Sequence, residues 1–373
     1  MRLNNVLGIL YASSSEYTVP ELVAHRTMGS IPFGGRYRAV DFVLSAMVNA
    51  GISHVLMPTK SNYRSLMDHI GNGKPWDLAR KREGIFILPP FSSQDSTGVY
   101  RNRVEALKGI LGFIREAEKE YVLLADGNLI CNPDFGDMLV EHIKTGADIT
   151  IAAMHSKPPK LINTMLLEHD ENKRVIKCAV TSDEIMLPFL WAPQIMLMKK
   201  DLLVDYIESV ADAQVASFER DMIQSCIGDL DIRTWELPNF LAAIDSLPSY
   251  YRASLALLQS ENRHLLFPRE RPVYTKVRDE APSVYGLDIN IKNCLIADGC
   301  TLRGNAENSL LFRGVRVDTG AVIRNSVIMQ DTVIGSGAVL DGVILDKGVT
   351  VSEGAMLSGT PNCPYYVGKG ISV

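Results

Sequence analysis

Five basic side chains in two short segments near the N-terminus are of the kind that binds small anions. They are Arg36, Arg38, Lys60, Arg64 and His69. A planar guanidinium group binds a phosphate or carboxylate group through two parallel hydrogen bonds, and a lysine adds a compact positive charge. The sequence therefore offers an anion-binding site. The alternative is that these residues are solvated surface charges.

The cysteines carry no sign of a metal centre. They stand at positions 131, 178, 226, 294, 300 and 363, without a CxxC pair or another metal-ligand spacing. Scattered cysteines of this kind are typical of a reducing compartment, and we expect no metal held by this chain. The apolar run near the N-terminus is too short to span a membrane. We therefore expect a cytoplasmic protein.

The overall charge limits the partners that the chain can have. The formal net charge is −5 and the isoelectric point is about 5.9. A surface for nucleic acid or for an anionic membrane needs a clustered excess of lysine and arginine. We therefore expect neither nucleic acid nor a membrane as a partner, while small anions can still bind locally.

The elements that position these side chains alternate between strand and helix. Apolar runs at residues 6–11, 54–59, 121–126 and 148–154 have the composition of buried strands, and residues 40–50 and 104–119 show helical spacing. This alternation predicts a doubly wound α/β domain with a mostly parallel sheet. Ligands of such sheets bind beyond the carboxyl ends of the strands, so the loops after Tyr11 and Ala125 are the places to expect chemistry.

The pattern changes after about residue 282. Small or aliphatic residues then recur every six positions, at Val315, Ala321, Val327, Val333, Val339, Leu345, Val351 and Leu357. A period of six predicts a left-handed parallel β-helix, with glycines 342, 348 and 354 at its corners; the alternative is an antiparallel sandwich. We expect a first domain at residues 1–260, a linker at 261–281 and the β-helix at 282–373.

One long segment resembles a known enzyme family. The stretch IPFGGRYRAVDFVLSAMVNAGI at residues 31–52 is similar to the PFGGKYRxIDFxLSNxxNSGI stretch of glucose-1-phosphate adenylyltransferases. Similar segments follow in the same order at residues 65–70, 120–128, 217–223 and 249–258, so the resemblance covers nearly the whole chain. It implies a Rossmann-like nucleotidyltransferase domain followed by a β-helix. The transfer of a nucleotidyl group to a sugar phosphate requires cationic groups and a divalent metal.

The phosphate-binding features of the family are missing here. Members have a GGxGTRL loop after the first strand, whose backbone amides and arginine bind phosphates. The aligned residues 13–18 read SSSEYT, so that Ser15 and Thr18 replace a glycine-rich loop with its arginine. Glu16 adds a negative charge that repels triphosphate. The lysine of the family's RAKP segment aligns with Met28.

The metal-binding and sugar-phosphate positions are also replaced. Members bind Mg²⁺ with two aspartates, in GDH and WRDVGT segments, and the alignment places Asn128 and Ala243 there. An amide can offer one neutral oxygen, but alanine offers no ligand. Asp126 and Asp245 stand two residues away, a shift of about 7 Å along an extended strand. The family's EKP lysine aligns with Thr181, and its GTADA turn reads NRVEA at residues 102–106.

This combination resembles the GlgD-type regulatory subunit of the family, inactive or weakly active alone. The resemblance implies that this chain needs no cofactor and that Mg²⁺ belongs to a catalytic ADP-glucose pyrophosphorylase subunit, its partner in a heterotetramer of glycogen biosynthesis. Association with further copies of itself stays open. In the family, positions matching the five basic residues lie near the β-helix and bind anionic effectors or inorganic phosphate.

Three other functions are compatible with parts of the sequence. An active adenylyltransferase with a rearranged metal site would need Asp126 or Asp245 to hold Mg²⁺. Many hexapeptide-repeat proteins are acyltransferases with a histidine base, but all seven histidines of this chain precede the β-helix. A free-standing ligand sensor would not need a catalytic partner, and co-purification would distinguish it from a subunit.

Overall fold

A mixed ten-stranded sheet forms the centre of the N-terminal domain. The computed structural model describes residues 4–12, 18–90, 100–160, 163–210, 212, 216–237 and 240–373. The strands follow the order β10 (Val175–Thr181), β9 (Thr164–His169), β11 (Phe189–Ala192), β8 (Ile149–Ser156), β12 (Met196–Lys199), β6 (Tyr121–Asp126), β1 (Val6–Tyr11), β4 (His54–Pro58) and β5 (Gly84–Leu88), and β13 (Ile232–Glu236) pairs with β8. Among the described helices, none is long and apolar enough to cross a membrane.

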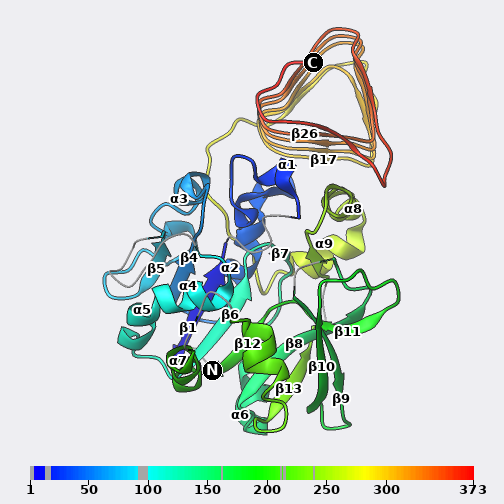
Figure 1. Ribbon diagram of the computed structural model, residues 1–373. Coiled ribbons are helices and arrows are strands. Elements are labelled where there is room, and N and C mark those ends of the chain that lie inside the picture. Colours follow the sequence, from blue (N-terminus) through cyan, green and yellow to red (C-terminus); the bar gives the residue numbers. More distant parts are fainter. Residues whose placement is uncertain are drawn as a thin grey trace.

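Helices cover both faces of the sheet, as an α/β domain requires (Figure 1). Leu7 and Ile9 of β1 pack with α4 (Arg103–Gly109), α5 (Leu111–Glu116) and α7 (Lys200–Ser209), whereas Val6 and Leu10 face α2 (Ala39–Asn49), α3 (Arg64–Ile70) and α6 (Phe135–Thr145). Successive residues of a strand point to opposite faces, so this one buried strand serves two cores.

We expected a mostly parallel sheet, but the sheet is mixed: it is parallel around β1 and mainly antiparallel elsewhere. β6, β1, β4 and β5 run parallel, and β13 runs parallel to β8. β9, β10, β11 and β12 pair antiparallel with their neighbours. Only a short turn at residues 170–174 joins β9 to β10, and such a short connection permits only antiparallel pairing.

Short elements complete the first domain. They are α1 (Pro20–Val23), the 3-10 helices η1 (Met28–Ser30) and η2 (Lys74–Trp76), the hairpin of β2 (Pro32–Phe33) and β3 (Tyr37–Arg38), the pair of β7 (Leu129–Ile130) and β14 (Ala242–Ala243), the π-helix η3 (Phe218–Gln224), α8 (Leu247–Ala256) and α9 (Ser260–Leu266). Helix α9 lies within the stretch that we expected to be a linker.

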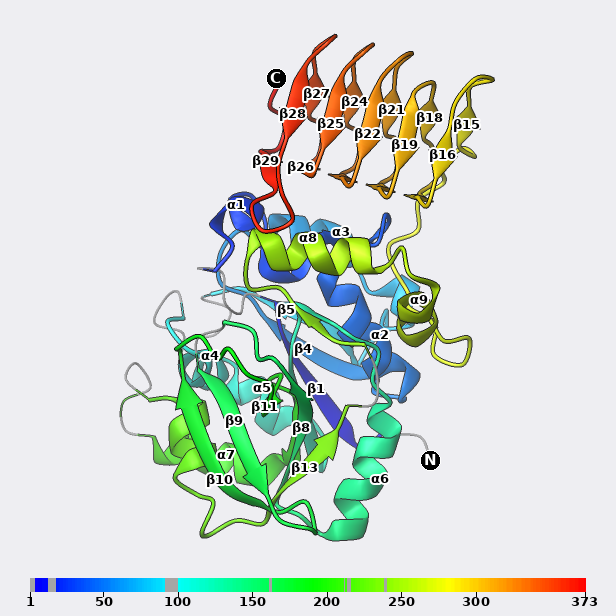
Figure 2. The ribbon, with the colours of Figure 1, turned by 90° about the vertical axis from the view of Figure 1, so that its right-hand side faces the viewer.

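Three parallel sheets form the triangular coil of the second domain (Figures 1 and 2). The first holds β15 (Val284–Tyr285), β18 (Thr301–Leu302), β21 (Arg316–Val317), β24 (Val333–Ile334) and β27 (Thr350–Val351). The second holds β16 (Ile291–Lys292), β19 (Asn305–Glu307), β22 (Val322–Arg324), β25 (Val339–Asp341) and β28 (Met356–Ser358). The third holds β17 (Leu295–Ile296), β20 (Leu310–Leu311), β23 (Val327–Ile328), β26 (Val343–Leu345) and β29 (Tyr365–Val367). The predicted parallel β-helix is confirmed.

The six-residue register is only approximate, because a coil is shorter than three repeats of six. Val317, Ile334 and Val351 pair in register, so that each of these coils takes 17 residues (351 minus 334). The exact six-residue series therefore slips by one position in each of these 17-residue coils. Val333 and Val339 of that series are half-buried, whereas their neighbours Ile334 and Leu340 are fully buried.

The two domains share one apolar core. Helix α8 lies along the β-helix (Figure 2), and its residues Tyr250 and Tyr251 pack in a cluster with Phe33, Leu310 and Val327. Both tyrosines also donate hydrogen bonds, Tyr250 to the carbonyl of Pro32 at 2.8 Å and Tyr251 to the carbonyl of Asn325. This contact holds one flank of the β-helix against the β2–β3 hairpin.

Candidate functional site

The first candidate site lies at the carboxyl ends of β1 and β6. These ends are neighbours, because Tyr11 pairs with Asp126 in the parallel register of the two strands. Of the predicted loop positions, Ser15 is outside the described residues and Thr18 is half-buried just before α1. Met28 is fully buried in the core between the domains. A lysine in its place would have to bury its charge.

The two positions that align with metal-binding aspartates come together in space. Ala243 of β14 pairs with Leu129 of β7, so it lies beside the preceding residue, Asn128. Asn128 is 1% exposed, and neither atom of its amide has a hydrogen-bond partner. One amide oxygen and one methyl group do not supply the set of oxygen ligands that Mg²⁺ requires. These residues do not fit the metal of the family.

The two nearby aspartates are engaged in other contacts. Asp126 forms an ion pair with Arg103 at 2.8 Å. Asp245 accepts hydrogen bonds from the backbone amide of Lys160 at 2.7 Å and the hydroxyl of Ser246 at 2.9 Å. Among the described residues, no group of three or more His, Cys, Asp or Glu side chains is placed to hold a metal ion.

Thr181 ends β10, opposite Thr164 of β9. It is half-buried, and its hydroxyl accepts a hydrogen bond from the backbone amide of Asp183 at 3.0 Å. The side chain thus stabilises the turn that follows the strand. It carries no charge with which to hold a sugar phosphate.

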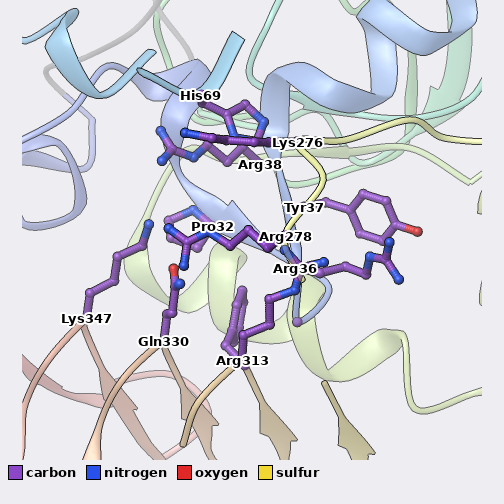
Figure 3. Close-up of a pocket in the computed structure, with 12 residues that line it drawn as sticks. Pro32, Arg36, Tyr37, Arg38, His69, Lys276, Arg278, Arg313, Gln330 and Lys347 are labelled. Carbon is purple, nitrogen blue, oxygen red and sulfur yellow. The ribbon is translucent and has the colours of Figure 1, made fainter. Parts of the chain in front are cut away.

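The second candidate site is a cationic pocket between the two domains (Figure 3). Its volume is about 410 Å³, including the part open to solvent. It is lined by Pro32, Gly35, Arg36, Tyr37, Arg38, His69, Lys276, Arg278, Phe312, Arg313, Gln330 and Lys347. Six of these residues are lysine or arginine, and none of the twelve described lining residues is acidic. The pocket therefore selects for an anion.

The first domain contributes its cations through the β2–β3 hairpin. Gly34 and Gly35 turn the chain with φ of +60° and +83°, which only glycine adopts without strain. A Cβ atom on Gly35 would lie 3.4 Å from the Cβ of Ala297 in the β-helix domain. The tight turn thus brings Arg36 and Arg38 against the second domain.

Arg38 and His69 are fixed by their own partners. The guanidinium of Arg38 donates to the carbonyl and hydroxyl oxygens of Ser65, both at 2.7 Å, and the Arg38 backbone amide donates to Asp41 at 3.0 Å. The Nε2 atom of His69 lies 2.6 Å from the buried carboxylate of Asp41. Burial lowers the pKa of His69 even though Asp41 opposes that change. The ring is therefore mainly neutral at pH 7.

The β-helix contributes one column of polar side chains. Arg313, Gln330 and Lys347 occupy the same place in three successive coils, 17 residues apart, and rise towards the first domain in Figure 3. Arg313 is 5% exposed, and its Nε atom has no hydrogen-bond partner. The Nε atom lies 3.6 Å from a carboxylate oxygen of Asp298, which is beyond hydrogen-bond distance, so the guanidinium can still donate to an anion.

Burial, together with neighbouring like charges, lowers the pKa of two cations of the pocket. The pKa of Lys347 is lowered to about 7, first by burial and then by the charges of Arg38 and Arg26. The pKa of Arg38 is lowered to about 10, mainly by burial. Among the described residues, no carboxylate lies within 4 Å of Lys347 Nζ. An anion in the pocket would relieve this repulsion.

Three of the five predicted basic residues line the pocket and two do not. Arg36, Arg38 and His69 are brought together, whereas Lys60 and Arg64 lie outside the lining. The residues that we missed are Lys276, Arg278, Arg313, Gln330 and Lys347. A search at a period of 17 instead of six would have found the last three.

Comparison with known proteins agrees with this geometry. Residues 22–177 match the family described as Nucleotidyl transferase, and residues 283–361 match the family described as GlmU-like, C-terminal hexapeptide. The glycogen biosynthesis protein GlgD of Geobacillus stearothermophilus is 37% identical over 324 residues, which are 86% of this chain and 83% of that protein. GlgD of Bacillus subtilis is 33% identical over the same shares. A glucose-1-phosphate adenylyltransferase of Fervidobacterium nodosum is 27% identical over 87% of this chain and 78% of its own length.

Fold and comparisons together define a nucleotidyltransferase-type domain followed by a hexapeptide β-helix, with a cationic pocket between the two. Its likeness to the GlgD proteins extends over both domains. The chain belongs to the ADP-glucose pyrophosphorylase family.

Proposed function

We propose that the chain is a regulatory subunit of ADP-glucose pyrophosphorylase in glycogen biosynthesis. Its partner would be a catalytic subunit that forms ADP-glucose and diphosphate from ATP and glucose 1-phosphate with Mg²⁺, in a heterotetramer. The observation that carries this proposal is that Asn128 and Ala243, neither of which has a carboxylate, stand at the two positions where the resemblance implies metal ligands, next to the β7–β14 pair. The curated GlgD relatives, described as glycogen biosynthesis proteins, support it.

We further propose that the cationic pocket receives the anionic effector of the assembly. Inorganic phosphate, or a small phosphorylated metabolite, matches six cations without a lining carboxylate. Residues of both domains line the pocket, so a bound anion would contact both domains and strengthen the contact between them. This gives the subunit a means of responding to metabolites although its own reaction centre is altered.

Turnover tests the first proposal. ADP-glucose formation is measured with this chain alone, with its catalytic paralogue alone, and with the two mixed in equal amounts. We expect negligible turnover by the chain alone and a higher rate for the mixture than for the paralogue. Robust turnover by the chain alone would favour the competing function, an adenylyltransferase with a displaced carboxylate at the metal. No change on mixing, together with separate elution of the two chains, would contradict a subunit role.

A further inference from the structure

Arg103 occupies the crevice in which a fold of this kind binds its ligand. Its Nη2 atom lies 2.8 Å from a carboxylate oxygen of Asp126, and its Nε atom lies 3.6 Å from one of Glu219. Its Cζ atom lies 4.6 Å from the centre of the Tyr11 ring. Tyr11 and Asp126 are the last residues of β1 and β6, so the guanidinium sits beyond the carboxyl ends of both strands.

Separate elements hold this guanidinium in place. Arg103 is the first residue of α4, whose start is capped by the side chain of Asn102. Glu219 comes from η3, and its second oxygen lies 3.3 Å from the amide of Asn163 and from the hydroxyl of Ser217. The arginine side chain is 10% exposed. The backbone of Arg103 is therefore fixed by α4, and its guanidinium is fixed by Asp126 and Glu219.

The charges of this cluster oppose a nucleotide. Burial alone would lower the pKa of Arg103, but Asp126 and Glu219 outweigh burial and raise it, so the guanidinium stays charged. One cation faces two buried carboxylates, which leaves a net charge of −1 in the crevice. That charge repels a triphosphate, and the carboxylates are already paired and so less able to attract Mg²⁺.

The crevice nevertheless contains buried polar atoms that lack hydrogen-bond partners. The hydroxyl of Tyr11, the Nη1 atom of Arg103 and both amide atoms of Asn128 are buried without a hydrogen-bond partner. Buried polar groups in a structural core are nearly always paired. The Tyr11 ring lies against Arg103, and unpaired groups of this kind are expected where a side chain has taken the place of a polar ligand.

We propose that Arg103, paired with Asp126 and Glu219, is a built-in occupant of the nucleotide crevice, and that this net negative cluster excludes magnesium nucleotides from this chain. The proposal rests on the proposed regulatory function and adds a reason why the altered site stays closed. Removal of the metal ligands alone would leave an open, low-affinity nucleotide site. With Arg103 in place, the chain does not compete with its catalytic partner for ATP.

Nucleotide binding to the isolated chain tests this inference. Titration calorimetry with ATP in excess Mg²⁺, and then with ADP-glucose, compares the wild type, Arg103→Ala and the neutral variant Arg103→Met/Asp126→Asn/Glu219→Gln. The neutral variant leaves no buried carboxylate unpaired, so it still tests the inference if Arg103→Ala does not fold. Arg115→Ala is the matched control, because it removes an exposed arginine paired with Glu208.

We expect the neutral variant to bind ATP at least about tenfold more tightly than the wild type, a difference of about 1.4 kcal/mol. Arg103→Ala leaves a net charge of −2 and should bind ATP no more tightly than the wild type. The control should bind as the wild type does. Equal affinity in all folded proteins would overturn the inference, and so would a wild-type dissociation constant clearly below about 1 mM. Either result leaves the turnover experiment with the catalytic paralogue unaffected, so the two proposals can fail separately.

Discussion

Arg26 and Asp346 form a buried ion pair that joins the two domains. The Nη2 atom of Arg26 lies 2.7 and 2.9 Å from the two carboxylate oxygens of Asp346, and both side chains are almost inaccessible to solvent. Tyr366 places its hydroxyl 2.8 Å from the same carboxylate and 3.0 Å from the carbonyl of Glu21 in α1. Because Lys347 follows Asp346 in sequence, the anion pocket and this pair share one coil of the β-helix.

Loss of the Asp346 carboxylate should destabilise the protein strongly. Asp346→Ala leaves the buried guanidinium of Arg26 without its partner, and such a loss is worth about 3–5 kcal/mol of unfolding free energy. Urea unfolding followed by circular dichroism measures the change. The control Asp77→Ala removes an exposed pair with Arg80 and should change stability by less than about 1 kcal/mol. Similar losses in the two variants would show that the interdomain pair is not important for stability.

Removal of pocket cations should weaken anion binding. Arg313→Gln and Lys347→Met each delete a positive charge from the lining, and a charge-assisted hydrogen bond is worth about 1.5–3 kcal/mol. We expect sulfate to bind roughly 10- to 100-fold more weakly to each variant, measured by calorimetry or by the rise of melting temperature with sulfate. Lys144→Met, which removes an exposed surface lysine, is the control and should bind as the wild type does. Unchanged affinity in both pocket variants would place the anion elsewhere.

The architecture could be predicted from the sequence, but half of the pocket could not. Short-range periodicity identifies strands such as Val6–Tyr11, because a buried strand must be apolar on both faces. Arg38 and Lys347 line the same pocket because of how the domains pack, and no local sequence pattern encodes that packing. The exact register of the β-helix was also out of reach. A one-residue shortening of each coil leaves the apolar pattern nearly unchanged and moves every side chain of the column.

At the carboxyl ends of β1 and β6, the sequence identifies single residues that stand in strict motifs, but it does not identify their contacts. Asn128 and Ala243 were identified by alignment, and the β7–β14 pairing puts them side by side. The ion pairs of Arg103 with Asp126 and Glu219 join three separate elements. Such a contact follows from tertiary structure, and residue type alone does not reveal it.

Anion binding should weaken as the pH rises through neutrality. The pKa of Lys347 is lowered to about 7, first by burial and then by Arg38 and Arg26; Asp346 acts in the other direction, and Arg278 adds to the lowering. Below pH 7 the amine is already protonated, whereas above pH 7 the complex must take up a proton. The affinity for sulfate, whose charge is constant in this range, should fall by up to about tenfold per pH unit above pH 7.

Two variants separate this effect from other titrations. Lys347→Met has no amine to titrate, so its weaker sulfate binding should be nearly independent of pH between about 7 and 9. The pKa of His69 is lowered by burial, so its ring is already mainly neutral in that interval and adds little. Without an anion, the wild type should gain stability relative to Lys347→Met from about pH 7 to 10, because the unfolded chain holds the lysine proton longer. A pH-independent affinity in the wild type would show that Lys347 does not contact the anion.

Restoration of the two metal carboxylates should restore metal binding without restoring turnover. Asn128→Asp/Ala243→Asp places one carboxylate directly before β7 and one in β14, and Mn²⁺ bound to them is detectable by electron paramagnetic resonance. We expect Mn²⁺ binding in the double variant, weak or no binding in each single variant, and ADP-glucose formation at the background level in all three. The cation positions explain the missing turnover, because Met28 is buried in the interdomain core and Thr181 is uncharged. Substantial turnover in the double variant would show that the metal ligands were the only missing part, and absence of Mn²⁺ binding would show that the two positions are not close enough to share an ion.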